Sequence, residues 1–469
     1  MTALELSAAI RAGKIGVPEA ASSYIDRIEQ SNNKYNAFIT IAKENALRRA
    51  QEVQARIDNK EELSPLAGVP VALKDNISTA GLETTCASKM LKDYKPIYNA
   101  AVTEKLERAG MIMIGKLNMD EFALEQSVSL NAARNPWDEN CPAGDGSAAA
   151  VAAGMTPIAV GSDTGGSIRR PCSYCGVTGI KPTYGSVSRF GIAACASSLD
   201  QGGAIGQDID DCAALLQLVS GPDERDSTCI IKEAFDFKEQ GKSQGIKIGF
   251  YFSGGIDDDV KKAVLAAAKE LEDAGALVEE FEMPLTDYVI PAYSIIRAAE
   301  VSSNLAKYDG LKYGHRSADA KTLSEVYRFS RSEGFGFDVK RNIMLGSLVL
   351  SSDYYDTYYR KALQVRSLIK DAYNKLFTKY DLILSPVTPY MSGANSDDPM
   401  QIYMDSIYTA SSDLAGLPAA ALPCGFNNQG MPLGFQLIGN AFSEKIIVDA
   451  GRVYQKRTEH HRRRPGGVQ

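Results

Sequence analysis

Residues 157–171 read Pro157-Ile-Ala-Val-Gly161-Ser-Asp-Thr-Gly-Gly-Ser167-Ile-Arg-Arg-Pro171, a short apolar run that ends in a glycine-rich polar turn. The apolar run predicts a buried strand, and the glycines permit a tight turn in which a substrate approaches the backbone closely. Successive N–H groups in such a turn can form an oxyanion hole. The stretch therefore predicts a strand that presents Ser167 as a candidate nucleophile.

The same arrangement of an apolar run before a polar turn recurs at Val69-Pro-Val-Ala-Leu73, which ends at Lys74. Further strands are expected at 111–114, 246–250, 382–384 and 433–438, and apolar spacing predicts a helix over 257–274. Strands that alternate with helices predict an α/β fold, with a central twisted mixed sheet covered by helices on both faces. Sites in such folds collect beyond the carboxyl ends of strands, where Lys74 and Ser167 stand.

The chain of 469 residues contains no internal repeat or Pro/Ser-rich linker, so we expect a single domain over 1–469. Residues 1–60 are expected to form a helical N-terminal layer, with a capping box at Thr2-x-x-Glu5 and Pro18 in the first turn of a second helix that runs to about residue 29. The basic tail 455–469 is interpreted as a frayed, solvated terminus, and a contact with RNA or a partner is the alternative.

The net charge of −7 and the pI of about 5.3 argue against a general polyanion-binding surface. The amphipathic N-terminus lacks the pattern of a signal peptide, and the apolar stretch 148–160 is too short to span a bilayer. Eight cysteines in a chain of this length indicate reduced thiols rather than a disulfide framework. We therefore expect a cytoplasmic protein without a membrane contact.

The chain is poor in histidine, which limits the chemistry available to Ser167. Two of its three histidines lie in the tail, and His315 has no catalytic signature around it. A lysine can replace histidine as the base, and Lys74 at the end of an apolar strand fits that role, although an ion-pair partner is the plainer interpretation. No metal and no cofactor are expected, since Cys172-x-x-Cys175 has no second ligand pair and the phosphate-loop patterns are absent.

The long motifs around these residues resemble the amidase signature family, and most closely the A subunits of its glutamyl-tRNA(Gln)/aspartyl-tRNA(Asn) amidotransferase branch. Nearly the whole chain takes part in the resemblance. The motifs that carry it are Lys74-Asp-Asn, Gly115-Lys-Leu-Asn-Met-Asp-Glu-Phe122, Arg134-Asn-Pro-Trp137, Gly161 to Pro171, Cys175 to Gly185, Ser197-Ser-Leu-Asp-Gln201, Ser303-Asn-Leu-Ala, Arg331 to Gly336, Ile343-Met-Leu-Gly346, Tyr354 to Tyr359 and Asn427 to Gly439.

The resemblance implies a Ser-cisSer-Lys triad that hydrolyses the amide of glutamine and passes ammonia to companion B and C subunits, which amidate a charged tRNA. It implies Ser167 as the nucleophile and Lys74 as the base. Thr164, Gly165 and Gly166 correspond to the oxyanion-hole turn. A small-molecule amide is the expected substrate, and tRNA is expected to be reached through the companion subunits.

The chain departs from the family pattern at the bridging serine. The family sequence Pro-Gly-Gly-Ser-Ser-Gly-Gly-Ser is replaced by a shorter loop, and aligning from Ser147 places Ala143 where the bridging serine is expected. Asp145 is the one titratable residue that this loop offers. Asp145 and Ser147 are therefore the candidate substitutes in the proton relay.

Two positions expected to bind substrate also differ. Arg341-Asn342 stands where the family has two arginines, the second of which is expected to hold the glutamine carboxylate. Asp405-Ser406 stands where the family has Ser-Asp, whose aspartate is expected to hold the amino group. Arg341 and Asp405, each one residue out of register, are the candidate substrate-binding residues.

These departures fall on the substrate and proton-relay positions of an otherwise intact pattern. We interpret the chain as an amidase-signature hydrolase or amidotransferase subunit with a Ser nucleophile and a Lys base. Two alternatives remain open. One is a catalytically impaired pseudo-amidase that acts as a binding or scaffold subunit, and the other is an amidase whose substrate is not glutamine.

Overall fold

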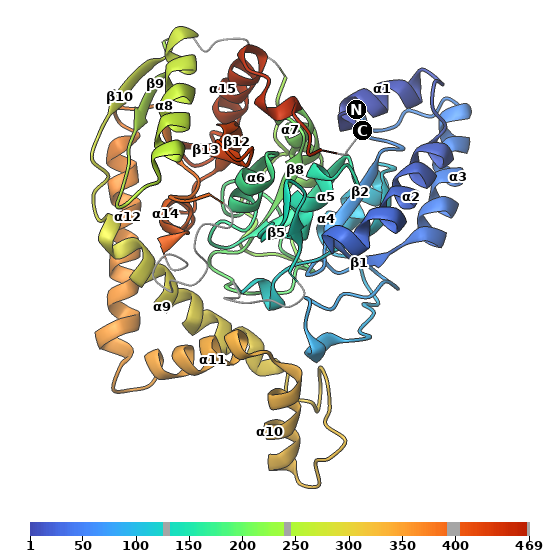
Figure 1. Ribbon diagram of the computed structural model, residues 1–469. Helices are drawn as coiled ribbons and strands as arrows, with labels where there is room; N and C mark the ends of the chain where they lie inside the picture. The colour runs from blue at the N-terminus through green and yellow to red at the C-terminus, as the bar shows by residue number, and fades with distance from the viewer. Residues whose placement is uncertain (125–131, 239–244, 392–403, 467–469) are drawn as a thin grey trace.

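The computed structural model describes residues 1–124, 132–238, 245–391 and 404–466. An 11-stranded mixed sheet runs through the molecule, in the order β1-β3-β2-β6-β8-β7-β12-β13-β11-β9-β10, and β4 and β5 form a separate two-stranded ribbon (Figure 1). The strands are β1 (Phe38–Ile41), β2 (Pro70–Lys74), β3 (Ile112–Leu117), β4 (Arg134–Asn135), β5 (Asp138–Pro142), β6 (Ile158–Asp163), β7 (Thr178–Lys181), β8 (Gln201–Gly206), β9 (Lys247–Phe250), β10 (Leu277–Glu280), β11 (Leu382–Pro386), β12 (Ala419–Phe426) and β13 (Pro432–Gly439).

Helices cover both faces of the sheet, which confirms the predicted α/β class. On one face α4, α7, α15 and α8 contact one another in series, and on the other α5 contacts α6 while α14 lies against α9 and α12. The helices are α1 (Ala3–Arg11), α2 (Val17–Tyr35), α3 (Lys43–Asp58), α4 (Ala101–Arg108), α5 (Gly146–Ala152), α6 (Arg169–Cys175), α7 (Ile209–Val219), α8 (Asp258–Asp273), α9 (Thr286–Asn304), α10 (Leu323–Gly334), α11 (Phe337–Val349), α12 (Arg360–Leu376), α14 (Ile407–Ala415) and α15 (Glu444–Arg457).

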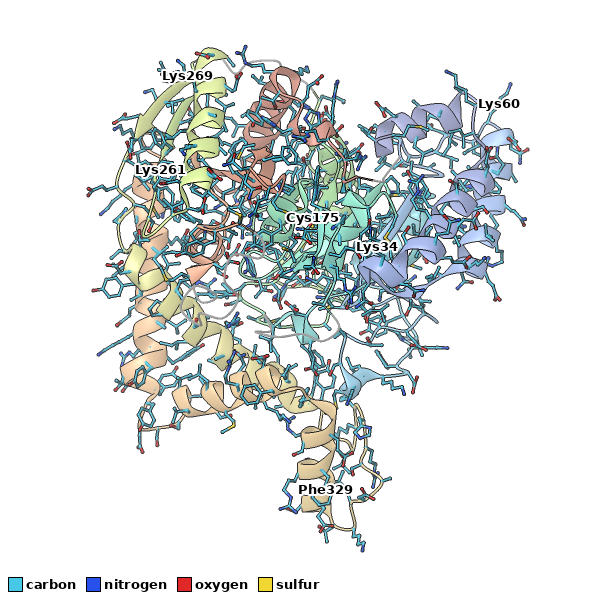
Figure 2. All side chains as sticks on the ribbon, viewed as in Figure 1. Lys34, Lys60, Cys175, Lys261, Lys269 and Phe329 are labelled. Carbon is cyan, nitrogen blue, oxygen red and sulfur yellow. The ribbon has the colours of Figure 1, made fainter. Side chains whose placement is uncertain are left out.

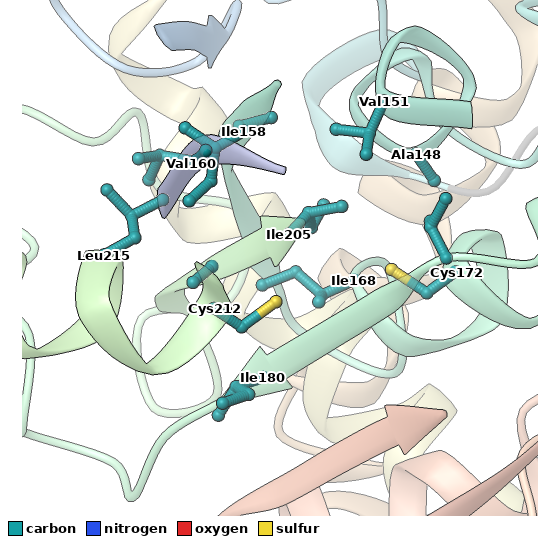
Figure 3. Close-up of a cluster of buried hydrophobic side chains, with 14 of the residues drawn as sticks. Ala148, Val151, Ile158, Val160, Ile168, Cys172, Ile180, Ile205, Cys212 and Leu215 are labelled. Carbon is teal, nitrogen blue, oxygen red and sulfur yellow. The ribbon is translucent and has the colours of Figure 1, made fainter. Parts of the chain in front are cut away.

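The main core lies where the central strands meet helices from both layers. Figure 3 shows apolar side chains of β6, β7 and β8 between those of α5 and α6 on one side and α7 on the other. Ile158, Ile180 and Ile205 are wholly buried there. Burying a side chain of this size stabilises a fold by about 1.5–3 kcal/mol, so this cluster fixes the strands that carry the turn at Ser167.

The predicted strands before the polar turns are confirmed with small shifts in their ends. β2 and β6 are parallel neighbours with Leu73 opposite Val160, so their carboxyl ends meet at one edge of the sheet. The N-terminal capping box is present, since Thr2 accepts from the Glu5 N–H and the Glu5 side chain accepts from the Thr2 N–H. The segment 1–60 also contributes strand β1, which the expectation of a helical layer did not include.

The interpretation of the C-terminal tail as frayed is wrong as far as residue 466. A short helix covers His460–Arg462, and His461 is buried with its carbonyl accepting from the Gln207 side-chain amide. The Arg463 guanidinium lies 4.0 Å from the centre of the Phe426 ring. The Arg464 guanidinium donates to the Val151 carbonyl, so the basic groups of the tail make contacts with the fold that a count of charges does not reveal.

Helices α9, α11 and α12 extend away from the sheet, and α10 projects furthest, carrying Phe329 (Figures 1 and 2). Cys175 lies near the middle of the molecule in the same view (Figure 2). No helix among the described residues is long and apolar enough to cross a membrane.

Candidate active site

Lys74 and Asp145 form a buried ion pair at the edge of the sheet where β2 ends. Lys74 Nζ lies 2.7 Å from Asp145 Oδ2, and the two side chains are 1% and 2% exposed. The Lys74 ammonium also donates to the Ser162 carbonyl at 3.2 Å. Both of the expected catalytic elements, the end of β2 and the end of β6, are therefore linked through this lysine.

Asp145 owes its position to the shortened loop before α5. Its side chain caps that helix by accepting from the Ser147 N–H at 2.8 Å, which leaves the other carboxylate oxygen for Lys74. Gly146 admits no side chain, because a Cβ there would lie 2.5 Å from the Ala37 carbonyl oxygen. Ala143, at the position expected for the bridging serine, is completely buried. The loop thus presents a carboxylate to Lys74 where the family pattern implies a hydroxyl.

The turn that carries Ser167 is held by close contacts from two distant helices. A Cβ on Gly165 would lie 2.0 Å from the Tyr293 hydroxyl oxygen, and one on Gly166, where φ is 125°, would lie 2.4 Å from Thr409 Oγ1. Thr409 also donates from its hydroxyl to the Gly165 carbonyl at 2.7 Å. A side chain therefore does not fit at either glycine, and at Gly166 the backbone conformation disfavours one as well.

Ser167 is half-buried, and its hydroxyl makes no hydrogen bond to another residue in the described parts of the chain. The Gly166 N–H donates to Asp163 Oδ1 at 2.6 Å. The N–H groups of Thr164 and Gly165 donate to no other described residue, so this face of the turn can supply donors to an oxyanion.

A network of buried charges lies beneath the turn. Arg169 donates to Asp163 and to Asp413, the latter at 2.6 Å, and Lys181 lies 3.4 Å from Asp413. Burial alone would raise the pKa of Asp163, but the charge and hydrogen bonds of Arg169 hold that pKa well below its ordinary value. Two cations thus balance two carboxylates, and the network fixes the start of α6 directly after Ser167.

Asp200, directly before β8, supports the turn. It accepts from the Thr164 hydroxyl at 2.6 Å and from the backbone N–H groups of Cys195 and Ala196. Burial raises the pKa of Asp200 to about 6, although these hydrogen bonds favour its ionised form. This aspartate orients Thr164 rather than meeting a substrate, because its oxygens are engaged inside the protein.

The other candidate residues lie in three different environments. Asp405 is close to the nucleophile turn, since it accepts from Arg170 at 3.0 Å and from the Tyr174 hydroxyl at 2.5 Å. Arg341 lies on the solvent side of α11, 55% exposed, paired with Asp338. Ser147 Oγ is buried and has no hydrogen-bond partner among the residues that the structure describes.

His315 and the Cys172-x-x-Cys175 pair are the two other sequence features weighed for chemistry. His315 is exposed and pairs with Glu333 at 2.8 Å, on the loop before the projecting α10. Cys172 and Cys175 are buried, which raises the pKa of both thiols. No group of three or more histidine, cysteine, aspartate or glutamate side chains that could hold a metal ion occurs within the described ranges.

Three residues beside the turn, Tyr293, Arg297 and Thr409, were not predicted from the sequence. Tyr293 and Arg297 lie on α9 and Thr409 on α14, more than a hundred residues from Ser167 along the chain. They belong to none of the glycine-rich motifs, and one sequence gives no sign that these helices return to the turn.

Comparison with known proteins places this geometry in a known group. The family model described as Amidase matches residues 19–448. The A subunit of glutamyl-tRNA(Gln) amidotransferase from Agathobacter rectalis is 50% identical, over 98% of this chain and 94% of its own length. The protein of the same name from Lachnoclostridium phytofermentans is 49% identical, over 97% of this chain and 98% of its own.

Solved structures show the same fold. The crystal structure of the A subunit of glutamyl-tRNA(Gln) amidotransferase from Thermotoga maritima is 35% identical with a TM-score of 0.77, covering 94% of this chain and 92% of that one. The peptide amidase of Stenotrophomonas maltophilia is 26% identical with a TM-score of 0.84, covering 100% of this chain and 98% of that one.

Proposed function

Because the chain belongs to the amidase family, we propose that Ser167 is the nucleophile with which it cleaves an amide bond. The chain is an amidase-signature protein of the amidotransferase A-subunit type. One observation carries the proposal: Ser167 stands on a turn whose Thr164 and Gly165 N–H groups donate to no other described residue, after the strand β6 that lies beside the end of β2 and its buried Lys74.

In the proposed reaction Ser167 Oγ attacks the amide carbonyl, and the N–H groups of Thr164 and Gly165 stabilise the oxyanion, with Gly166 shaping the turn. The Ser167 proton passes through a water to the Asp145 carboxylate, whose charge Lys74 balances. Asp145 then protonates the departing amine or ammonia, and water hydrolyses the acyl-enzyme. The family resemblance implies Lys74 as the base. Because Lys74 is already engaged by a carboxylate and a carbonyl, we propose that here it acts together with Asp145, as the counter-charge of that carboxylate.

We propose that the chain acts with companion B and C subunits, because relatives that match it over nearly their whole length carry the name of an amidotransferase subunit. Ammonia released at Ser167 would then serve the amidation of a charged tRNA held by those subunits. Ser147, buried behind Asp145, is proposed to position the relay loop, and Arg341 and Asp405 remain candidate contacts to the substrate. The proposed place of action is the cytoplasm.

Labelling with a fluorophosphonate probe, together with hydroxamate formation from small amides, tests this proposal on the wild type and on Ser167→Ala. We expect the wild type to be labelled and to turn over an amide, and Ser167→Ala to do neither while keeping its melting temperature. Absence of both signals in a folded wild type would overturn the proposal.

A second function, a binding subunit without catalysis, is favoured by a specific observation. Among the described residues, Ser167 Oγ has no hydrogen bond to Lys74 or to Asp145, so a continuous protein path for its proton is not formed. The same labelling experiment decides between the two functions. A wild type that binds the companion subunits but reacts with neither probe would be a scaffold.

A further inference from the structure

A second cation lies near the nucleophile turn, on α9. The Tyr293 hydroxyl is packed against Gly165, where a Cβ would lie 2.0 Å away from it. One helical turn further along, the Arg297 guanidinium lies 5.0 Å from the centre of the Tyr293 ring, and Arg297 Nη1 is 3.5 Å from the Tyr293 hydroxyl oxygen. Arg297 therefore stands one side chain away from the turn that holds Ser167.

Arg297 and Lys74 both act on the buried Cys195. Burial and the charges of Asp200 and Glu300 raise the pKa of the Cys195 thiol well above its ordinary value, while the charges of Arg297 and Lys74 lower it. Arg297 on α9 and Lys74 at the end of β2 are thus both near enough to one thiol for their charges to act on it.

Helix α11 does not provide the guanidinium that the family pattern implies at position 342. Asn342 is 5% exposed, and its side-chain amide donates to the Asp338 carbonyl within α11. The helices α9 and α11 touch at Gly346, where a Cβ would lie 1.9 Å from the Ala298 carbonyl oxygen. Arg297 is the neighbour of Ala298, so it lies next to the contact between α9 and α11.

Asp405, the candidate partner of a substrate ammonium, already accepts hydrogen bonds from within the protein. Asp405 accepts from Arg170 at 3.0 Å and from the Tyr174 hydroxyl at 2.5 Å. A substrate ammonium would have to displace these two donors to reach the carboxylate. Arg170 is balanced by Asp405, so the added positive charge of Arg297 favours a substrate with a negative charge, and the engaged Asp405 disfavours one with an ammonium group.

We propose that Arg297 holds the carboxylate of the substrate, and that this substrate is a monoamide of a dicarboxylic acid that needs no α-ammonium group. The inference rests on the proposed function, because it concerns the substrate of the same site. Arg297 is a specificity-determining residue in this view. Its guanidinium would meet the carboxylate in a charge-assisted hydrogen bond while the far amide lies at Ser167.

Three amides of matched length test the proposal: glutaramic acid, L-glutamine and pentanamide, in which a methyl group replaces the carboxylate. Ammonia release is measured as kcat/KM for the wild type, Arg297→Gln, Arg297→Lys and the control Arg328→Gln. Arg328 is an exposed arginine over the Phe329 ring on α10, so its replacement makes the same change of charge far from the turn. Circular dichroism melting confirms that each variant is folded.

In the wild type we expect kcat/KM for glutaramic acid to exceed that for pentanamide by about tenfold or more. It should be at least as high as kcat/KM for glutamine. Arg297→Gln should reduce kcat/KM for glutaramic acid to the level of pentanamide, Arg297→Lys should restore part of the preference, and Arg328→Gln should keep all of it. A preference for glutaramic acid that survives Arg297→Gln, or a tenfold preference for glutamine, would overturn the inference.

If the wild type releases ammonia from none of the three, the proposed function fails and ligand binding decides the inference by itself. Glutaramic acid should then raise the melting temperature of Ser167→Ala, and pentanamide should not. Loss of that rise in Ser167→Ala/Arg297→Gln supports the carboxylate contact. An equal rise in both proteins, or none in either, overturns it.

Discussion

Lys74 Nζ lies 2.7 Å from Asp145 Oδ2, and both side chains are almost completely buried, so each charge depends on the other. Asp145→Asn keeps the helix cap but removes the counter-charge of Lys74. We expect the free energy of unfolding to fall by roughly 3–5 kcal/mol, because an unpaired ammonium would remain buried. Urea denaturation measures this loss. The double variant Lys74→Met/Asp145→Leu should recover most of it, and an Asp145→Asn protein as stable as the wild type would contradict the dependence.

Arg169 is the central cation of the network beneath the nucleophile turn. Arg169→Met leaves Asp163 and Asp413 buried with Lys181 as their one remaining partner in the network, and we expect the free energy of unfolding to fall by roughly 3–5 kcal/mol. The matched control is Arg360→Met, which breaks an exposed i,i+4 pair with Asp356 and should cost less than about 1 kcal/mol. Equal losses in the two variants would show that the network contributes nothing beyond a surface pair.

Asp200 should make the stability depend on pH. Its pKa is raised from 3.8 to about 6 in the folded protein, so its contribution is fully present below about pH 4 and is lost as the pH rises through 6. The shift corresponds to about 3 kcal/mol between pH 4 and pH 7.

Comparing unfolding curves of the wild type and Asp200→Asn across this range isolates the effect. Asparagine also loses one acceptor for the surrounding N–H groups, which changes the stability equally at every pH. The difference between the two proteins should therefore change with pH in the stated direction. If the difference in unfolding free energy between the two proteins is the same at every pH, Asp200 does not titrate in this range.

Gly166 is expected to tolerate no side chain. In Gly166→Ala the new Cβ would meet Thr409 Oγ1 at 2.4 Å on a backbone with φ of 125°, so both the contact and the conformation are unfavourable. We expect a loss of about 2 kcal/mol or more in unfolding free energy, together with loss of fluorophosphonate labelling. Gly13→Ala, with φ of 67° and open space around the Cβ, measures the conformational part alone. Labelling that persists in Gly166→Ala would show that the turn can adapt.

The strands beside the site differ in how clearly their sequences indicate them. Val69 to Leu73 is a plain apolar run, and its end at Lys74 was predictable. Strand β8 (Gln201–Gly206) was not, because half of its residues are glycines placed against close neighbours: a Cβ on Gly203 would lie 2.3 Å from the Ile180 carbonyl oxygen. Packing, rather than propensity, makes this segment a strand.

The residues of the candidate site also differ in how clearly the sequence indicates them. Ser167, Lys74 and Asp145 were predicted from motifs and from the shortened loop, since each lies within or beside a recognisable pattern. The contact between Lys74 and Asp145 joins residues 71 positions apart, and Arg297 is linked to the turn only through Tyr293 on the same helix. Such contacts depend on how helices cross over the sheet, and no local rule in one sequence specifies that.

The Lys74–Asp145 pair also limits how this lineage can change. Replacing either partner alone leaves a charge stranded in the interior, and Asp145 is tied in addition to the start of α5 through Ser147. A sequence that regained a bridging serine would first pass through an unstable intermediate, unless both positions and the loop length changed together. The effects of substitutions at these two positions on stability are therefore not additive, and the pair is difficult to replace one residue at a time.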